Sequence, residues 1–205
     1  NMLAKRKDVE DKEWCAHVQA KCWNAKTLLS TDLDTTWLTI GDSHTAAFAP
    51  PGSMVIKTDG LTLNGQIRSD FQYIKDHIWK CNNLKGITMS FGNIDVRHHL
   101  CRLNIDPRDM WIDWFRFGDS LPFEVEYSTP WPIEHEERRL PKTGYYRDQP
   151  FWGSREDRVI QLERIIETFE KTNTPRIAYP QDWLTMDPEV FAKTKMESTS
   201  SVHIS

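Results

Sequence analysis

The chain has 205 residues and a mass of 24.1 kDa, enough for one domain and too short for two ordinary ones. Hydrophobic residues make up 39% and charged residues 27% of it, which is typical of a globular protein and excludes a disordered one. The formal charge of −4 argues against a general nucleic-acid binder, whose surface would be basic. No apolar run is long enough to span a bilayer and no signal peptide is recognisable, so we expect a cytoplasmic protein with no membrane partner.

Hydrophobic periodicity predicts helices that alternate with short buried strands. The expected helices cover 11–29, 66–81, 155–172 and 188–195, and the expected strands cover 36–40, 55–57, 87–91 and 176–179. This alternation predicts an α/β fold: a three-layer α/β/α sandwich, flavodoxin-like, with a parallel sheet of four or five strands.

Residues 105–153 lack this periodicity and are rich in tryptophan and proline. We interpret residues 1–205 as a single domain in which 105–153 form an irregular insertion, with a candidate hairpin at 123–127. Its aromatic side chains and the basic stretch 138–147 offer a surface for a phosphate, a sugar or single-stranded nucleic acid. The alternative is that the aromatic residues pack the insertion onto the core; those of the first part are Trp111, Trp114, Phe115 and Phe117.

Ligands of parallel α/β sheets bind beyond the carboxyl ends of the strands. The turn after the first expected strand reads Gly41-Asp42-Ser43-His44. A serine at the tip of a strand, after a glycine that allows a tight turn, can project its hydroxyl into the crevice, and its backbone N–H can bind an oxyanion. The alternative is that Asp42 or Ser43 only caps a helix.

The turn after the third expected strand holds five polar residues, Asn93, Asp95, Arg97, His98 and His99. Asn93 can donate to an oxyanion, Arg97 can pair with Asp95 or clamp an anion, and His99 can orient a neighbour. The alternative is a closed turn with a surface Arg–His pair. Adjacent histidines usually point apart, so we expect no metal on Asp95, His98 and His99.

His203 lies in the polar C-terminal tail, where a histidine is usually a solvated side chain. A serine hydroxyl is a weak nucleophile until a neighbouring group takes its proton. In company with Ser43, His203 is therefore the candidate general base.

Together these pieces resemble the SGNH (GDSL-like) hydrolase superfamily. Its first block, a strand followed by Gly-Asp-Ser, is matched by residues 41–43, and its catalytic histidine near the C-terminus is matched by His203. Its third block is a strand followed by a Gly-x-Asn-Asp turn. Residues 92–99 are still more similar to a variant in proteins of surface-polysaccharide biosynthesis, which has Gly-Glu-Ile-Asp followed by an arginine and a histidine. The resemblance implies the sandwich fold and ester chemistry by a serine and a histidine.

The oxyanion donors depart from the family pattern. The family's asparagine comes two residues after the glycine of its third block, where this chain has Ile94, so Asn93 is one position early. The second-block glycine, whose backbone N–H joins that of Ser43 in the family, corresponds to Gly60 or Gly65.

The catalytic acid of the family also has no direct match. The family's acid lies three residues before the histidine, a position that Ser200 occupies here. Either a Ser–His dyad operates, or Asp182 or Asp187 replaces the acid.

The sequence therefore predicts serine-dependent ester chemistry, as an esterase, a deacetylase or an O-acyltransferase acting on a small-molecule or glycan acyl ester. Ser43 attacks the acyl carbonyl and His203 carries the proton, with no metal or organic cofactor required. Five further residues are expected to contact the substrate or orient these groups: Asp42, His44, Asp95, Arg97 and His99. The alternative from another class is a binding or scaffolding module that keeps the fold without catalysis; a nucleic-acid-linked role through 138–147 is the weakest of the three.

Overall fold

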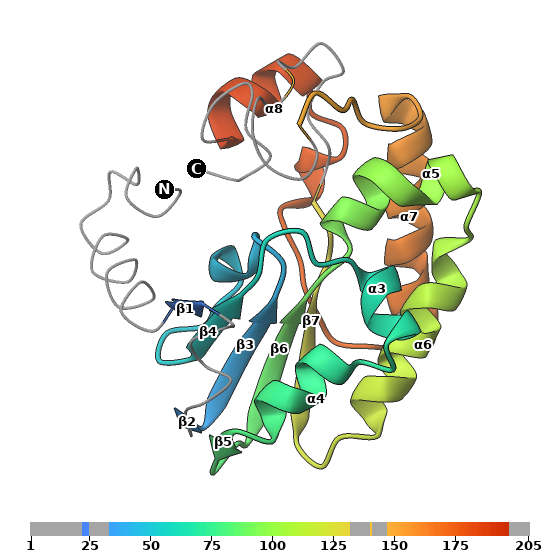
Figure 1. Ribbon diagram of the computed structural model, residues 1–205. Helices are drawn as coiled ribbons and strands as arrows, with labels where there is room; N and C mark the ends of the chain where they lie inside the picture. The colour runs from blue at the N-terminus through green and yellow to red at the C-terminus, as the bar shows by residue number, and fades with distance from the viewer. Residues whose placement is uncertain (1–21, 25–32, 132–139, 141–146, 197–205) are drawn as a thin grey trace.

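The computed structural model describes residues 22–24, 33–131, 140 and 147–196 (Figure 1). All strand pairs of the central sheet are parallel. The sheet has six strands, in the order β1 (Cys22–Asn24), β4 (Met54–Lys57), β3 (Trp37–Gly41), β6 (Gly86–Ser90), β7 (Glu124–Ser128) and β8 (Arg176–Ile177). A second, two-stranded parallel sheet consists of β2 (Leu33–Asp34) and β5 (Cys81–Asn82).

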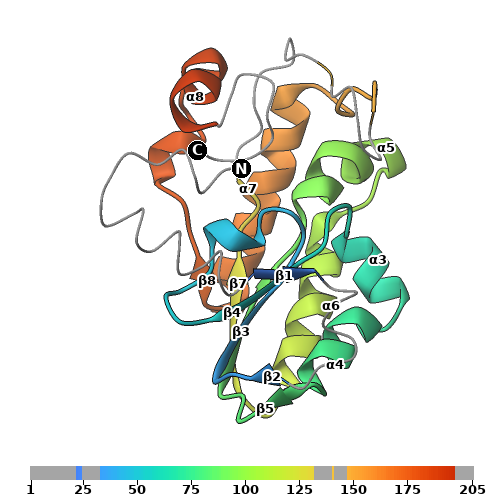
Figure 2. The same cartoon turned by 60° about the vertical axis from the view of Figure 1, so that its left-hand side comes forward.

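Helices flank the central sheet. One face is covered by α3 (Leu63–Arg68), α4 (Gln72–Ile78), α6 (Pro107–Asp119) and α7 (Arg155–Thr172) (Figure 1). Two short 3-10 helices, η2 (Thr45–Ala47) and η4 (Gln181–Trp183), and the helix α8 (Pro188–Lys195) lie on the other side, toward the carboxyl ends of the strands (Figure 2). The architecture is α/β, as expected for a three-layer α/β/α sandwich. None of the described helices combines the length and the apolar character that a membrane crossing requires.

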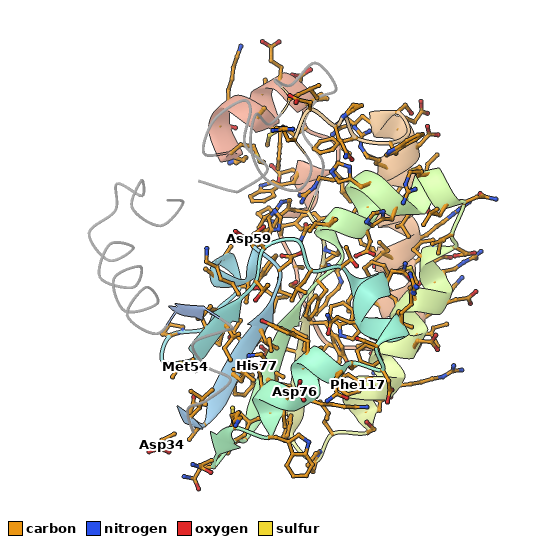
Figure 3. All side chains as sticks on the ribbon, viewed as in Figure 1. Asp34, Met54, Asp59, Asp76, His77 and Phe117 are labelled. Atoms are coloured by element: carbon orange, nitrogen blue, oxygen red, sulfur yellow. The ribbon has the colours of Figure 1, made fainter. Side chains whose placement is uncertain are left out.

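The core lies between the sheet and the layer of α3, α6 and α7. Its strands are buried on both faces, as in parallel sheets generally, so they are almost continuously apolar. The rings of Phe71 and Phe117 stack with their centroids 4.2 Å apart and so connect the start of α4 to α6. Figure 3 labels Phe117. Trp114 of α6 is fully buried and meets Phe91 at 5.9 Å and Tyr127 at 4.9 Å.

The prediction of an irregular insertion over 105–153 was wrong for its first half. Asp106 caps a 13-residue helix, α6, which has Pro107 at its first position. The buried residues of α6 recur at helical spacing and the charged residues between them lie on the exposed face, so the sequence did carry the amphipathic pattern of this helix. Trp111, Trp114, Phe115 and Phe117 are all core residues of α6, which confirms the packing alternative.

The predicted hairpin at 123–127 was also wrong. These residues belong mainly to β7, which pairs in parallel with β6 on one side and β8 on the other. The sheet consequently gains a strand that the sequence did not predict. Most of the basic stretch 138–147 lies outside the described residues.

The other predicted elements were confirmed, with two exceptions. The helix expected over 66–81 is two helices, because Asp70 and Phe71 have φ values of 52° and 56° in the left-handed region. The helix expected over 11–29 was wrong at Cys22–Asn24, which form β1, and the rest of that range lies outside the described residues.

Strand register brings three turns to the same edge of the sheet. Gly41, at the end of β3, pairs with Lys57 of β4 and with Ser90 of β6. The turns that follow β3, β4 and β6 therefore begin at one level, where α/β proteins hold their ligands.

The backbone around Gly41 leaves no room for a side chain, and this can be tested. A Cβ there would overlap the carbonyl group of Ser90, which is held by the backbone N–H of Asp42 at 3.0 Å. Because this backbone cannot yield, we expect Gly41→Ala to lower the free energy of unfolding by about 3 kcal/mol. Gly60→Ala is the matched control: its φ of 82° is strained for alanine but its surroundings are open, so about 1 kcal/mol should be lost. Urea unfolding followed by tryptophan fluorescence measures both, and equal losses would contradict the steric argument.

Candidate active site

The turn after β3 is shaped by Asp42, while Ser43 stays partly exposed. The Oδ1 atom of Asp42 accepts the backbone N–H of His44 at 2.9 Å, and its carbonyl oxygen accepts the hydroxyl of Thr45 at 2.6 Å. These contacts close the turn, but the N-cap of η2 is His44 and has no side-chain capping hydrogen bond, so neither Asp42 nor Ser43 caps that helix. The Ser43 side chain lies at the carboxyl edge of the sheet, between two fully buried neighbours, Asp42 and His44.

His44 is fully buried and bridges Asp42 and Arg97. Its Nδ1 lies 3.0 Å from Oδ1 of Asp42, and its Nε2 lies 3.3 Å from Nη1 of Arg97. A guanidinium group only donates hydrogen bonds, so Nε2 must be the accepting nitrogen. The ring proton therefore belongs on Nδ1, from which it is donated to Asp42.

This tautomer decides what His44 can do for Ser43. The Ser43 Oγ atom lies 3.5 Å from Nδ1 of His44, the same nitrogen that donates to Asp42. A nitrogen that already carries a proton cannot accept one from the serine. His44 thus orients the turn and is not placed to accept a proton from Ser43. The candidate base, His203, and the position of the missing acid, Ser200, both lie outside the described residues.

Asp42 remains a carboxylate despite its burial. Burial alone would raise its pKa, but hydrogen bonds and electrostatic attraction from His44, together with the charge of Arg97, outweigh it. The pKa of Asp42 is therefore below its usual value, and the group stays ionised at neutral pH.

The helix after β6 opens with a π-helical turn, η3 (Asp95–His99), and continues as α5 (Leu100–Leu103). A π-turn is wider than an α-turn and is often found at functional sites. Here it buries Asp95, Arg97 and His98 at once. The sequence placed polar residues in this turn but gave no signal of the π geometry.

The side chain of Asp95 accepts hydrogen bonds from the start of α3, whereas the sequence had suggested Arg97 as its partner. Its carboxylate accepts the backbone N–H groups of Leu63 at 2.7 Å and Asn64 at 3.1 Å. Burial raises the pKa of Asp95 to about 6; the charge of Asp42 adds to this effect, while the backbone hydrogen bonds oppose it. Asp95 thus connects the turn after β6 to the crossover after β4.

Arg97 lies between His44 and the segment that precedes α7. Its guanidinium group faces the ring of Phe151 at 5.9 Å, and its carbonyl oxygen accepts the backbone N–H of Trp152 at 2.9 Å. His98 meets the same ring edge-on at 5.4 Å. Phe151 was not a candidate from the sequence, where the aromatic pair Phe151–Trp152 after a proline gave no signal of this contact.

Asn93 connects the turn after β6 to the turn after β7. Its Oδ1 atom accepts the backbone N–H of Trp131 at 3.3 Å, and among the described residues its buried Nδ2 has no hydrogen-bond partner. The ring of Trp131 meets His44 edge-on at 4.7 Å and stacks with Phe48 at 5.1 Å. An aromatic wall, of which Phe48 was missed from sequence, therefore stands beside the Ser43 turn.

The two candidate oxyanion glycines differ in their surroundings. The N–H of Gly65 lies within α3 and donates to the side chain of Thr62, the N-cap of that helix, at 2.9 Å. Gly60 is exposed in the turn after β4, directly after Asp59, which lies at the upper edge of the sheet in Figure 3. Gly60 is therefore the better placed of the two.

The remaining candidates have other local partners. His99 is half-buried and accepts from Arg102, in the next turn of its helix, at 3.2 Å; burial and the charge of Arg102 lower its pKa. Asp187 caps α8 through the backbone N–H groups of Glu189 and Val190. Asp182 is exposed in η4. Within the described part of the chain, no three His, Cys, Asp or Glu side chains gather as a metal site.

The raised pKa of Asp95 makes a prediction about stability. Folding favours its protonated form, so its contribution to stability is fully present below about pH 4 and is lost as the pH rises through about 6. Asp95→Asn cannot titrate. Its free energy of unfolding, relative to wild type, should therefore increase by about 2 kcal/mol between about pH 4 and pH 7. Urea titrations across this range test it, with the exposed Asp113→Asn as control; a difference that does not change with pH would contradict the burial argument.

Comparisons with known proteins give the fold and no family. No protein-family model and no curated protein matches the chain. One solved structure, from Streptococcus pneumonia and provisionally described as a platelet activating factor, superimposes with a TM-score of 0.57. The match covers 96% of this chain and 89% of the other, at 12% sequence identity. At that identity the match shows a shared α/β fold.

Proposed function

We propose that the protein performs serine-dependent ester chemistry, with Ser43 as the nucleophile. The observation that carries this proposal is the Ser43 turn itself. A partly exposed serine follows the central strand β3, and the residues on both sides of it are fully buried and hydrogen-bonded. Such a rigid turn fixes a nucleophile in one orientation, which is what catalysis by proximity requires.

The proposed reaction has two steps. The Ser43 oxygen attacks the acyl carbonyl while His203 takes its proton, and His203 then returns that proton to the departing alkoxide. An acyl group remains on Ser43. In the second step, water or a sugar hydroxyl loses its proton to His203 and attacks the acyl carbonyl; His203 then returns that proton to the departing Ser43 oxygen, which restores the free hydroxyl. Water as acceptor gives an esterase or deacetylase, and a hydroxyl acceptor gives an O-acyltransferase.

The oxyanion of each step needs fixed donors. We assign the backbone N–H of Ser43 and that of Gly60, the glycine whose N–H is not used to cap α3. The buried Nδ2 of Asn93 is a third donor, since no described residue accepts from it. One such donor typically contributes a hundred- to a thousand-fold in rate.

His44 and Arg97 have a positioning role in this proposal. Arg97 fixes the tautomer of His44, and His44 holds the Asp42 side chain that shapes the turn. This division of work assigns proton transfer to His203 and orientation to His44.

Fluorophosphonate labelling of the native chain tests the nucleophile. We expect stoichiometric labelling of wild type and its loss in both Ser43→Ala and His203→Ala. Ser69→Ala is the control: Ser69 is an exposed serine at the end of α3, so its loss should leave labelling intact. A folded wild type that does not react would contradict the proposal and favour a binding module, and labelling that survives in Ser43→Ala would place the nucleophile elsewhere.

The assignment of the base is tested by a matched pair of glutamine variants. Glutamine at position 44 still supplies one donor for Asp42 and one acceptor for Arg97, so His44→Gln should keep the labelling rate within about tenfold of wild type. Glutamine at position 203 removes the base, so His203→Gln should lower the rate by roughly 10²- to 10⁴-fold. Thermal unfolding of both variants checks that the fold is kept, and the reverse order of rates would make His44 the base.

A further inference from the structure

A cavity of about 400 Å³ lies at the amino ends of the strands, at the opposite end of the sheet from Ser43. Its walls are the second half of α6, the loop from α6 into β7, the start of β7, and the end of α7 with the loop that follows it. The loop from α6 into β7 lies at the bottom of Figure 1. The cavity is large enough for a small organic molecule.

Three aromatic rings line this cavity: Phe115, Phe123 and Tyr127. Phe115 and Tyr127 are nearly fully buried and meet edge-to-face at 5.0 Å between centroids. Gly118 lets α6 lie directly on this floor, because a Cβ there would overlap the Tyr127 hydroxyl. The aromatic floor is therefore built into the packing of α6 on β7.

The polar groups around these rings are mainly negative. Two helices end at the cavity, α6 at Asp119 and α7 at Thr172, and helix C-termini present carbonyl oxygens with partial negative charge. Asp119 adds a full negative charge and, after burial, is the second cause that raises the pKa of Tyr127. Asp119 and Tyr127 both line the cavity, so the carboxylate acts on the cavity floor.

The positive side chains nearby already have acidic partners. Arg116, which lines the cavity, pairs with Asp113 at 3.1 Å, and Lys171 in the last turn of α7 pairs with Glu167 at 2.7 Å. Both pairs are largely exposed and neutralise their own charge. The negative charge of Asp119 and the partial negative charges of the two helix C-termini therefore make the electrostatic potential in the cavity negative.

We propose that this cavity binds a small organic cation, an ammonium group carried on an aromatic or alkyl body. Aromatic rings attract an ammonium ion through their faces, and the carboxylate and helix carbonyls attract it electrostatically. The site is separate from the proposed ester chemistry and does not depend on it.

Isothermal titration of the full-length protein with three probes of similar size tests the proposal: benzyltrimethylammonium, benzyl alcohol and phenylacetate. We expect benzyltrimethylammonium to bind with a dissociation constant of about 1 mM or tighter. The neutral alcohol should bind at least about fivefold more weakly, and phenylacetate should bind more weakly still. Equal binding of the three probes, or no binding of the cation, would overturn the proposal.

Two variants locate the site. Asp119→Asn removes the charge at the cavity and should weaken benzyltrimethylammonium about fivefold. Asp109→Asn, in the exposed first turn of the same helix, is the matched control and should leave the affinity unchanged. If both variants weaken binding equally, the cation binds through the general charge of the surface and the proposal fails. Fluorophosphonate labelling of Ser43 should be the same in both, so failure here is distinguishable from failure of the ester chemistry.

Discussion

The carboxyl edge of this sheet is organised around one buried charge, the Asp42 carboxylate. An unpaired charge in a protein interior costs several kcal/mol, so Asp42 can be buried only with partners that keep it ionised. His44 comes from the same turn, but Arg97 comes from the turn after β6. The position of η3 relative to β3 is therefore fixed by electrostatics as well as by packing. Asp95, two residues before Arg97, extends this connection to α3. Three segments of the chain thus share one polar network beneath Ser43.

This network includes the histidine that follows Ser43. His44 is buried and hydrogen-bonded to Asp42 and Arg97, so it gives the turn rigidity. Ser43 keeps access to solvent because its two neighbours carry the structural contacts. The aromatic wall of Trp131 and Phe48 packs against the turn through the edge-on contact of Trp131 with His44.

Much of the fold could be predicted from the sequence, because β3, β4, β6, α7 and α8 have clear periodicity and end signals such as Gly41, Asn173 and Pro188. The helix in segment 105–131 was missed although its cap, Asp106, and the spacing of its buried residues are encoded locally, because 105–153 was interpreted as one irregular stretch. β7 was missed with it, since it follows α6 with only a short turn between. For the site, the clusters around Ser43 and Asp95 were found from residue types at strand ends. The tautomer of His44, the π-turn and the Asp95–α3 contact depend on distances between segments far apart in the chain, which no local pattern encodes. His203 remains a prediction.

The strand order has a consequence for how the chain acquires this site as it is synthesised. β3 lies at the centre of the sheet, yet its neighbours β4 and β6 both follow it in the chain. A parallel pair needs a long crossover between its strands, so β3 leaves the ribosome with neither neighbour available. Its apolar residues and open backbone groups stay unprotected until β6 arrives, and Asp42 lacks Arg97 until η3 follows. Parallel, non-local pairing of this kind is slow and exposes strands to aggregation. β6 and η3 thus complete the polar network, and their synthesis also ends the interval in which β3 is exposed to aggregation.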